Sequence, residues 1–192
     1  MPLLLRNDAA HTALGVLLVA WSVGETILQR RVRRQSQTRF DWTYYVVVAS
    51  LVLGIVLGFR LAGVHAATVD GGWWLVGFGL AIFCAGVAFR FWAMLVLGRF
   101  FTFRVSIQEG HRVVATGPYR FVRHPGYTGL LLACAGLGIA CSNALSLGVM
   151  ILLPLAGILV RIRVEERALN RALGDAYATY ASGKARLIPG IW

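Results

Sequence analysis

Long apolar stretches alternate with short polar segments along most of the chain. Five apolar segments lie at about 12–28, 43–61, 73–97, 127–141 and 144–160. A helix needs about 17–25 mostly apolar residues to cross the hydrocarbon core of a bilayer, and the first three segments reach that length. The last two are shorter and are separated only by the turn residues Ser142 and Asn143. This pattern predicts an all-α integral membrane helical bundle of about five transmembrane helices, whose last two form a hairpin.

The tail that follows the last apolar segment has the pattern of an amphipathic helix. Large apolar side chains recur there at spacings of three and four, at Leu169, Leu173, Tyr177 and Tyr180. The pattern predicts a cytosolic amphipathic helix that begins at Arg161 and ends near Ser182 and Gly183.

The overall composition excludes a soluble domain. Hydrophobic residues make up 58% of the chain and charged residues only 14%, whereas a soluble domain carries about 25% charged residues. The 19 Lys and Arg against 8 Asp and Glu give a formal net charge of +11. In a soluble protein such a charge would indicate a nucleic-acid partner. Here the arginines lie beside apolar segments, so we expect no nucleic-acid partner and membrane lipids with anionic headgroups instead.

The arginines also predict the topology. They fall in three blocks, at about 30–39, 98–126 and 161–186, whereas residues 62–72 contain neither Lys nor Arg. Since short loops rich in basic residues stay in the cytoplasm, we expect the N-terminus outside and the C-terminus in the cytoplasm, with the first apolar segment as an uncleaved anchor. A single lysine and abundant Ala and Gly favour a bacterial inner membrane.

The three cysteines are interpreted as small buried residues. Cys84, Cys134 and Cys141 lie inside apolar segments and form no Cys-x-x-Cys pair. Neither a metal site nor a disulfide framework is expected from this spacing.

The segment EGHRVVATGPYRFVRHPGYTG, residues 109–129, concentrates polar side chains just before the hairpin. Its two prolines, Pro118 and Pro125, interrupt regular backbone hydrogen bonding. Because unpaired peptide groups are not tolerated at membrane depth, this segment is expected to pack against protein or to bind a polar ligand. His124, at the mouth of the hairpin, is a candidate for either role.

Arg161, Glu165 and Glu166 form a second polar group, where the chain leaves the membrane. Arg161 and Glu165 have the i,i+4 spacing of a simple helical ion pair. The two adjacent acids could instead accept hydrogen bonds from ribose hydroxyls or an amino group and attract a cationic ligand.

Arg90 and Glu25 are charges within predicted membrane helices. An arginine near the bilayer centre is costly, so it must face the bundle interior or water and have a partner. Glu25 could be that structural partner. Alternatively, Arg90 could anchor a substrate, because a guanidinium matches a carboxylate in two hydrogen bonds.

Taken together, these features resemble the isoprenylcysteine carboxyl methyltransferase family and its phospholipid methyltransferase relatives. The resemblance runs from about Arg90 to the end of the chain. It is carried by Arg90 with Ala93, Met94 and Gly98, by His111-Arg112-Val113-Val114, by Gly117-Pro118-Tyr119 and Arg123-His124-Pro125-Gly126-Tyr127-Thr128-Gly129, and by Glu165-Glu166 with Leu173-Gly174-x-x-Tyr177-x-x-Tyr180.

The resemblance implies an enzyme that takes a methyl group from S-adenosyl-L-methionine. It implies a single domain over 1–192, with an N-terminal two-helix segment at 1–62 and a core at 73–192. The cofactor-binding residues that it implies are His111, Arg112, Val113, Val114, Gly117, Tyr119, His124, Pro125, Tyr127, Glu165 and Glu166. Arg90 and Arg161 would meet a lipophilic acceptor that comes from the bilayer. The polar segment and the acidic pair should then enclose a nucleoside-sized cavity.

Several functions remain open at this level. The acceptor implied by the resemblance is a prenylcysteine carboxylate, which needs no general base because it is ionised at neutral pH. A phospholipid amine, which would need a base, and a small thiol are alternatives. An NADPH-dependent sterol or enone reductase is a further alternative, although Glu165 and Glu166 would repel the phosphates of NADPH. A non-catalytic membrane scaffold is the last alternative.

Overall fold

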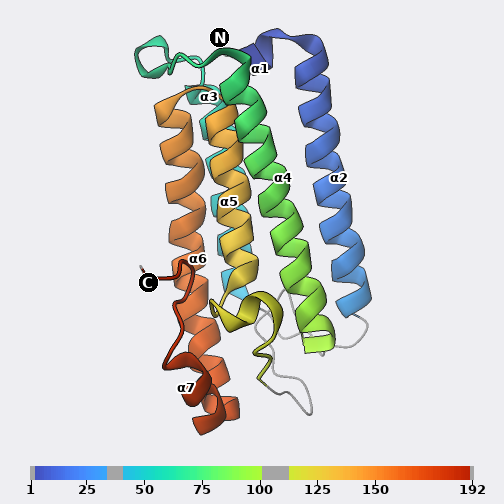
Figure 1. Ribbon diagram of the computed structural model, residues 1–192, viewed down its shortest axis with the longest axis vertical. Coiled ribbons are helices and arrows are strands. Elements are labelled where there is room, and N and C mark those ends of the chain that lie inside the picture. Colours follow the sequence, from blue (N-terminus) through green and yellow to red (C-terminus); the bar gives the residue numbers. More distant parts are fainter. Residues whose placement is uncertain (1–2, 34–40, 101–112, 191–192) are drawn as a thin grey trace.

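Long helices run side by side over most of the molecule (Figure 1). The computed structural model describes residues 3–33, 41–100 and 113–190. Its α-helices are α1 (Leu3–Arg6), α2 (Asp8–Arg33), α3 (Trp42–Leu61), α4 (Gly72–Leu97), α5 (Pro125–Ala140), α6 (Ala144–Leu173) and α7 (Asp175–Ala181). Short 3-10 helices lie between them: η1 (His65–Ala67), η2 (Gly98–Phe100) and η3 (Gly117–Arg120).

Four of these helices are long and apolar enough to cross a membrane. They are α2 over Asp8–Leu28, α3, α4 and α6, and the apolar helix α5 is shorter, with 16 residues. Many aliphatic side chains point outward, among them Val19 and Leu152, which are 63% and 64% exposed. Such a surface suits lipid tails, so the molecule is an integral membrane helical bundle, as the hydropathy pattern predicts.

The closest helix contact, between α4 and α5, depends on glycines. A Cβ added at Gly86 would collide with the backbone nitrogen of Ala133, and one added at Gly129 would lie 2.7 Å from the backbone nitrogen of Arg90. Small residues let membrane helices approach until their backbones touch. The result is that Arg90 of α4 lies directly beside the start of α5.

The hairpin of α5 and α6 is confirmed, and it packs on α3. Asn143 caps α6 by accepting a hydrogen bond from the Ser146 amide at 3.1 Å, and its own amide donates to the Val64 carbonyl at 2.9 Å. The Ser146 hydroxyl donates to the Gly58 carbonyl at 2.7 Å. These bonds fix the closed end of the hairpin against the end of α3.

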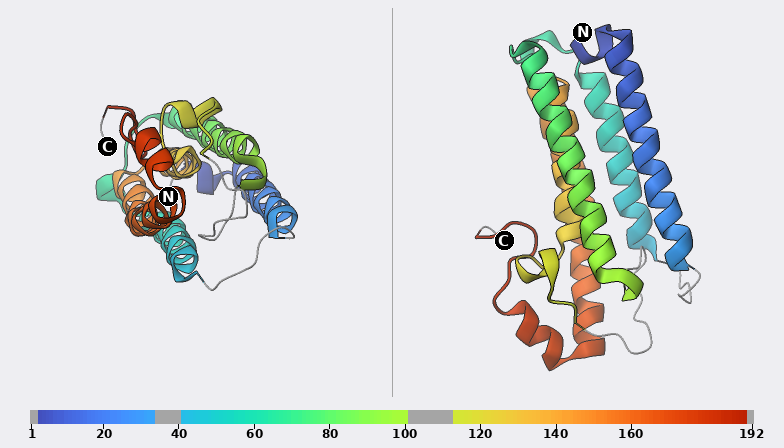
Figure 2. Two further views of the ribbon diagram at one scale, coloured as in Figure 1. Left: turned by 90° about the horizontal axis from the view of Figure 1, so that it is seen from below. Right: turned by 45° about the vertical axis from the view of Figure 1, so that its right-hand side comes forward.

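Helix α2 stands at the edge of the bundle, beside α4 (Figures 1 and 2). Trp21 packs edge-to-face on Phe83 of α4, with ring centroids 5.7 Å apart. Gly24 leaves room for Phe91, because a Cβ there would lie 2.8 Å from that ring. Most of the other side chains of α2 are exposed.

The tail differs from its predicted form in one respect. It is helical, but no new helix begins at Arg161, because α6 continues without a break from Ala144 to Leu173. The helix ends at Gly174, whose φ of +52° favours glycine, and α7 follows. A continued helix can bury an apolar face at helical spacing as well as a new helix can. The spacing therefore did not show where one helix ends and the next begins.

The interpretation of the cysteines holds for two of the three. Cys134 and Cys141 are buried, whereas Cys84 is exposed on the outer side of α4. An apolar segment that faces lipid exposes small residues as readily as it buries them, so the segment's hydropathy alone did not separate the two cases. The predicted division into 1–62 and 73–192 stays a prediction.

Candidate active site

Polar side chains gather at one end of the bundle, where α5 begins and the second half of α6 extends beyond the other helices. We call this region, made of residues 117–128 and 161–187, the polar end; in Figure 1 it lies around η3, the lower part of α6 and α7. The C-terminal segment lies alongside the approach to α5. The amides of Arg123 and His124 donate to the carbonyls of Ala185 and Arg186 at 2.9 and 3.0 Å.

The described part of the polar segment before the hairpin therefore packs against protein, which is one of the two alternatives that the sequence left open. Two further contacts join the same segments. The Arg123 Nε donates to the Lys184 carbonyl at 3.0 Å, and the Thr128 hydroxyl donates to the Leu187 carbonyl at 2.8 Å. The polar segment before the hairpin is held by the last residues of the chain.

Glu166 is the centre of a first polar cluster. Its Oε1 accepts from Arg123 Nη1 at 2.7 Å and lies 3.4 Å from His124 Nε2, and its Oε2 accepts from Arg186 Nε at 3.0 Å. Glu166 is only 9% exposed. The two guanidinium groups around the carboxylate keep Glu166 ionised and fixed.

Tyr127 is the centre of a second cluster, which joins α3, α5 and α6. Its hydroxyl donates to Glu165 Oε2 at 2.9 Å and accepts from Arg161 Nε at 2.5 Å. Arg161 Nη1 donates to Asp41 Oδ2 at 2.9 Å and to the Thr43 hydroxyl at 3.0 Å. Arg161 and Glu165 are thus linked through Tyr127, in place of the simple i,i+4 pair that their spacing allowed.

Arg90 forms a third cluster with α2 and α5. Its Nε and Nη2 donate to the two oxygens of Glu25, the second at 3.1 Å, and its Nη1 donates to the Gly126 carbonyl at 2.9 Å. The prediction that Glu25 is the structural partner of Arg90 is confirmed. Anchoring of a substrate by Arg90 stays a prediction.

Two tyrosines of the polar end, Tyr119 and Tyr177, are buried. The Tyr119 carbonyl accepts from the Tyr180 hydroxyl at 2.8 Å. Burial, and then the charge of Glu165, raise the pKa of the Tyr119 phenol, so it stays protonated at neutral pH. The Tyr177 hydroxyl is buried and has no hydrogen-bond partner in the described part of the chain. A buried unpaired hydroxyl is costly, so a polar partner from beyond the described part of the chain is expected.

The other candidate residues from the sequence analysis either lie at or near the polar end or fall outside the described residues. Pro125 begins α5, and Gly117 has a φ of +56° and packs against Val96. Val113 and Val114 are half-buried. His111 and Arg112 lie outside the described residues. The nucleoside-sized cavity stays a prediction, since residues 101–112 lie outside the described part as well.

Sequence reasoning missed two charged residues of these clusters, Asp41 and Arg186. Asp41 carried a signal, because Asp-x-Thr directly before an apolar segment is the pattern of a helix cap. Arg186 carried none, since its contact with Glu166 depends on how the tail returns to the polar end.

Comparisons with known proteins agree with the geometry. A family model described as the isoprenylcysteine carboxyl methyltransferase (ICMT) family matches residues 79–171. Protein-S-isoprenylcysteine O-methyltransferases A and B of Arabidopsis thaliana are 33% and 32% identical over 121 residues, which are 62% of this chain and 61% of each relative. The chain therefore spans about three fifths of the length of the curated relatives that it matches.

A solved structure of the eukaryotic intramembrane Ras methyltransferase ICMT is also similar. Its TM-score is 0.58 at 26% sequence identity, and the match covers 80% of this chain and 55% of that one. The fold and the sequence therefore point to the same group of proteins. Residues 79–171, which include Arg90, Tyr127, Arg161 and both glutamates, match the model of the isoprenylcysteine carboxyl methyltransferase family.

Proposed function

We propose that this protein is an S-adenosylmethionine-dependent integral membrane methyltransferase that methylates the carboxylate of a prenylcysteine-like or other lipophilic substrate. The family match and the activity for which the Arabidopsis relatives are named support this proposal. The observation that carries it is the convergence of Arg123, His124 and Tyr127 with Glu165 and Glu166 at one end of the bundle.

The polar end suits the proposed cofactor. When bound, S-adenosylmethionine supplies a methyl carbon on a sulfonium cation, together with ribose hydroxyls and an amino acid group. Carboxylates such as Glu165 accept hydrogen bonds from hydroxyl and amino groups, and the unpartnered Tyr177 hydroxyl provides a further donor. We place His111, Arg112, Val113, Val114, Gly117, Tyr119, His124, Pro125, Tyr127, Glu165 and Glu166 around the cofactor.

The acceptor carboxylate is placed between Arg90 and Arg161. Both guanidiniums are buried and fixed by several hydrogen bonds. A carboxylate is already ionised at neutral pH, so the protein has to align the reactants and exclude water, which is worth about 7–11 kcal/mol when the geometry is ideal. An amine acceptor would need a base, and all three candidates are already engaged. Glu166 accepts from Arg123 and lies beside His124, and Glu165 accepts from Tyr127. This favours the carboxylate over the phospholipid amine.

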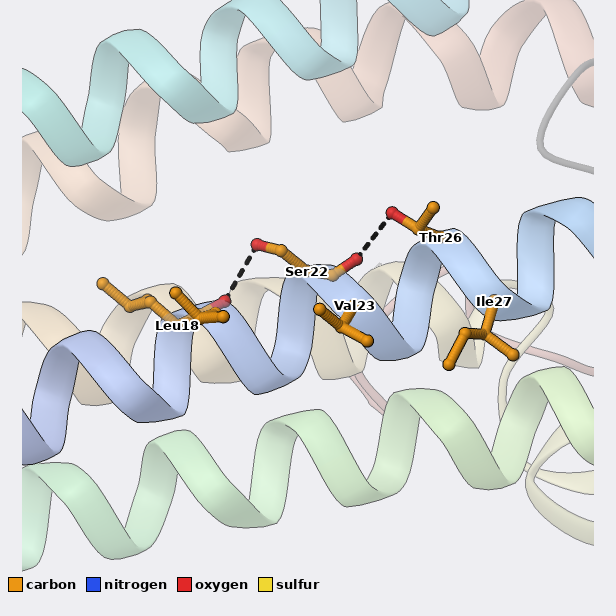
Figure 3. A pocket seen from close by; sticks show the side chains of 6 residues that line it. Leu18, Ser22, Val23, Thr26 and Ile27 are labelled. Carbon is orange, nitrogen blue, oxygen red and sulfur yellow. Dashed lines mark hydrogen bonds between the residues drawn. The ribbon is translucent and has the colours of Figure 1, made fainter.

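A groove on α2 supports the approach of a lipophilic tail from the bilayer. It has a volume of about 460 Å³ and is formed by Leu18, Val19, Ser22, Val23, Thr26 and Ile27. Figure 3 shows that the hydroxyls of Ser22 and Thr26 bond back to carbonyls of their own helix, both at 2.8 Å. The groove therefore presents no unpaired donor to a hydrocarbon chain, and it runs along the same helix as Glu25.

The alternatives lack this support. A reductase that binds NADPH would have to place phosphates beside Glu165 and Glu166. A non-catalytic scaffold gives no reason for the unpartnered Tyr177 hydroxyl. We also propose that the polar end faces the cytoplasm of a bacterial cell, with the N-terminus outside, as the arginine distribution predicts.

Calorimetry and a methylation assay test the proposal. The purified protein should bind S-adenosylhomocysteine and should transfer a labelled methyl group from S-adenosylmethionine to an N-blocked S-farnesylcysteine with a free carboxylate. The methyl ester of the same compound is the control and should accept nothing. Binding of NADPH without binding of S-adenosylhomocysteine would contradict the proposal.

A further inference from the structure

Two acidic residues that precede the family match, one in α2 and one at the start of α3, each pair with an arginine of the core. Glu25 of α2 binds Arg90 of α4, and Asp41, the cap residue of α3, binds Arg161 of α6. Both acids precede residue 79, where the family match begins. The two arginines proposed to meet the acceptor are therefore each paired with an internal carboxylate.

Glu25 occupies one complete edge of the Arg90 guanidinium. Nε and Nη2 donate to its two oxygens, and Nη1 donates to the Gly126 carbonyl at 2.9 Å. Trp21 Nε1 donates to Glu25 Oε1 at 3.2 Å and holds the carboxylate in place. A guanidinium has five N–H groups, and these bonds engage one on each nitrogen. The second N–H of Nη1 and that of Nη2 are left for another acceptor.

Asp41 combines a helix cap with an ion pair. Its Oδ1 accepts from the Thr43 amide at 3.0 Å, as in an N-cap, while its Oδ2 accepts from Arg161 Nη1 at 2.9 Å. Asp41 is 8% exposed and Arg161 is 3% exposed. The start of α3 thus fixes the guanidinium of Arg161 in a second direction, across from Tyr127.

Within each of the two ion pairs, Glu25 with Arg90 and Asp41 with Arg161, the formal charges cancel. Methyl transfer forms a bond between a carboxylate oxygen and the methyl carbon while the bond from that carbon to sulfur breaks and its electron pair stays on sulfur. One negative and one positive charge disappear together. An arginine without an internal partner would hold the acceptor's charge strongly in the ground state and oppose this step. A paired arginine orients the acceptor and leaves its charge to the sulfonium.

We propose that Glu25 and Asp41 are positioning residues, which orient Arg90 and Arg161 and limit how tightly these arginines hold the acceptor carboxylate. This rests on the proposed methyl transfer to a carboxylate. The N-terminal helices then act on the reaction itself, beyond filling space beside the core. Neither residue contacts the reacting atoms in this scheme, since each acts through its arginine.

The test compares Glu25→Gln and Asp41→Asn with the wild type in the S-farnesylcysteine assay. Each variant keeps the side-chain shape and removes one charge. We expect kcat to fall about tenfold, since a tenfold change corresponds to about 1.4 kcal/mol of barrier, while the KM for the acceptor stays the same or falls. The dissociation constant of S-adenosylhomocysteine, measured by calorimetry, should stay within about twofold. Asp70→Asn, which removes an exposed acid between α3 and α4, is the matched control.

A second series covers the case in which a single variant fails to fold. In an Arg90→Gln background the guanidinium through which Glu25 would act is gone, so adding Glu25→Gln should change kcat by less than about twofold if Glu25 acts only through Arg90. A raised acceptor KM with unchanged kcat, or full additivity in the double variant, would overturn the inference while leaving the methyltransferase intact. A wild type that neither binds S-adenosylhomocysteine nor methylates the probe would overturn the proposed function, and this inference with it.

Discussion

At the scale of single residues, the polar end is built from side chains that each contact more than one helix or segment. Tyr127 of α5 contacts two residues of α6, and Glu166 of α6 contacts both the approach to α5 and the C-terminal segment. Removal of one member therefore leaves its former partners buried and unpaired. An unpaired buried charge typically costs several kcal/mol, so single substitutions here should have measurable effects.

Glu166→Gln should weaken cofactor affinity. The substitution removes the charge that Arg123 and Arg186 share, so both guanidiniums repel each other and the approach to α5 loses its anchor. We expect the dissociation constant of S-adenosylhomocysteine to rise about tenfold, or about 1.4 kcal/mol, by calorimetry. Asp175→Asn, at an exposed acid of α7, should leave it unchanged. Equal affinity in Glu166→Gln and wild type would show that Glu166 does not shape the cofactor site.

Tyr127→Phe should slow turnover more than it weakens cofactor binding. The ring is kept, but Arg161 loses an acceptor and Glu165 loses a donor. A lost partner of a buried polar group costs about 1–3 kcal/mol, and it frees Arg161 to move. We expect kcat in the methylation assay to fall about tenfold or more. An unchanged kcat would mean that Arg161 does not need Tyr127 for its orientation.

At the scale of helices, the contact between α4 and α5 brings Arg90 to the polar end. The two backbones touch at the glycines of both helices. Only residues without a side chain allow this distance, and the distance is what lets Nη1 of Arg90 reach the Gly126 carbonyl. The glycines therefore contribute to the geometry of the site as well as to packing.

Gly86→Ala should destabilise the bundle and lower activity together. The added Cβ would collide with the Ala133 backbone, so α4 and α5 must separate. Overpacking of this kind costs about 1–3 kcal/mol, and we expect a lower midpoint of thermal unfolding in detergent. Gly77→Ala is a matched control on the same helix, because nothing lies within 4 Å of its added Cβ. Equal midpoints for the two variants would contradict the close contact.

At the scale of the whole molecule, the two ends of the bundle differ in their content of basic residues. Residues 62–72, between α3 and α4, contain no Lys or Arg, whereas α6 beyond the apolar region carries Arg163, Arg167 and Arg171 on exposed positions. Basic segments are retained in the cytoplasm. The polar end and the loop of residues 62–72 should therefore face opposite sides of the membrane.

Single-cysteine labelling measures this orientation. In a variant without Cys84, Cys134 and Cys141, a cysteine at Asp70 should react with a membrane-impermeant maleimide in intact cells. One placed at Arg171 should react only after the cells are opened. The reverse pattern would invert the topology and place the polar end outside.

The sequence alone determined the membrane class and the helical segments, and it carried the resemblance to the methyltransferase family. Hydropathy acts locally along the chain, so the apolar segments and the hairpin were found without coordinates. Arg90, His124, Tyr127 and Glu165-Glu166 were named as polar side chains beside these segments, and the resemblance to the family implied their roles. Their grouping at one end of the bundle was expected, because the resemblance implied that the polar segment before the hairpin and the acidic pair enclose one cavity.

The tertiary structure alone decided which side chains meet. It paired Asp41 with Arg161 and Arg186 with Glu166, confirmed the pairing of Glu25 with Arg90, and extended α6 past Arg161. These contacts join residues that lie far apart in the chain. From the sequence alone, each of these charged residues has several possible partners of opposite charge. Only the backbone contact of α4 with α5 and the return of the C-terminal segment select among them, because a buried charge pairs with whatever packing brings within about 3 Å.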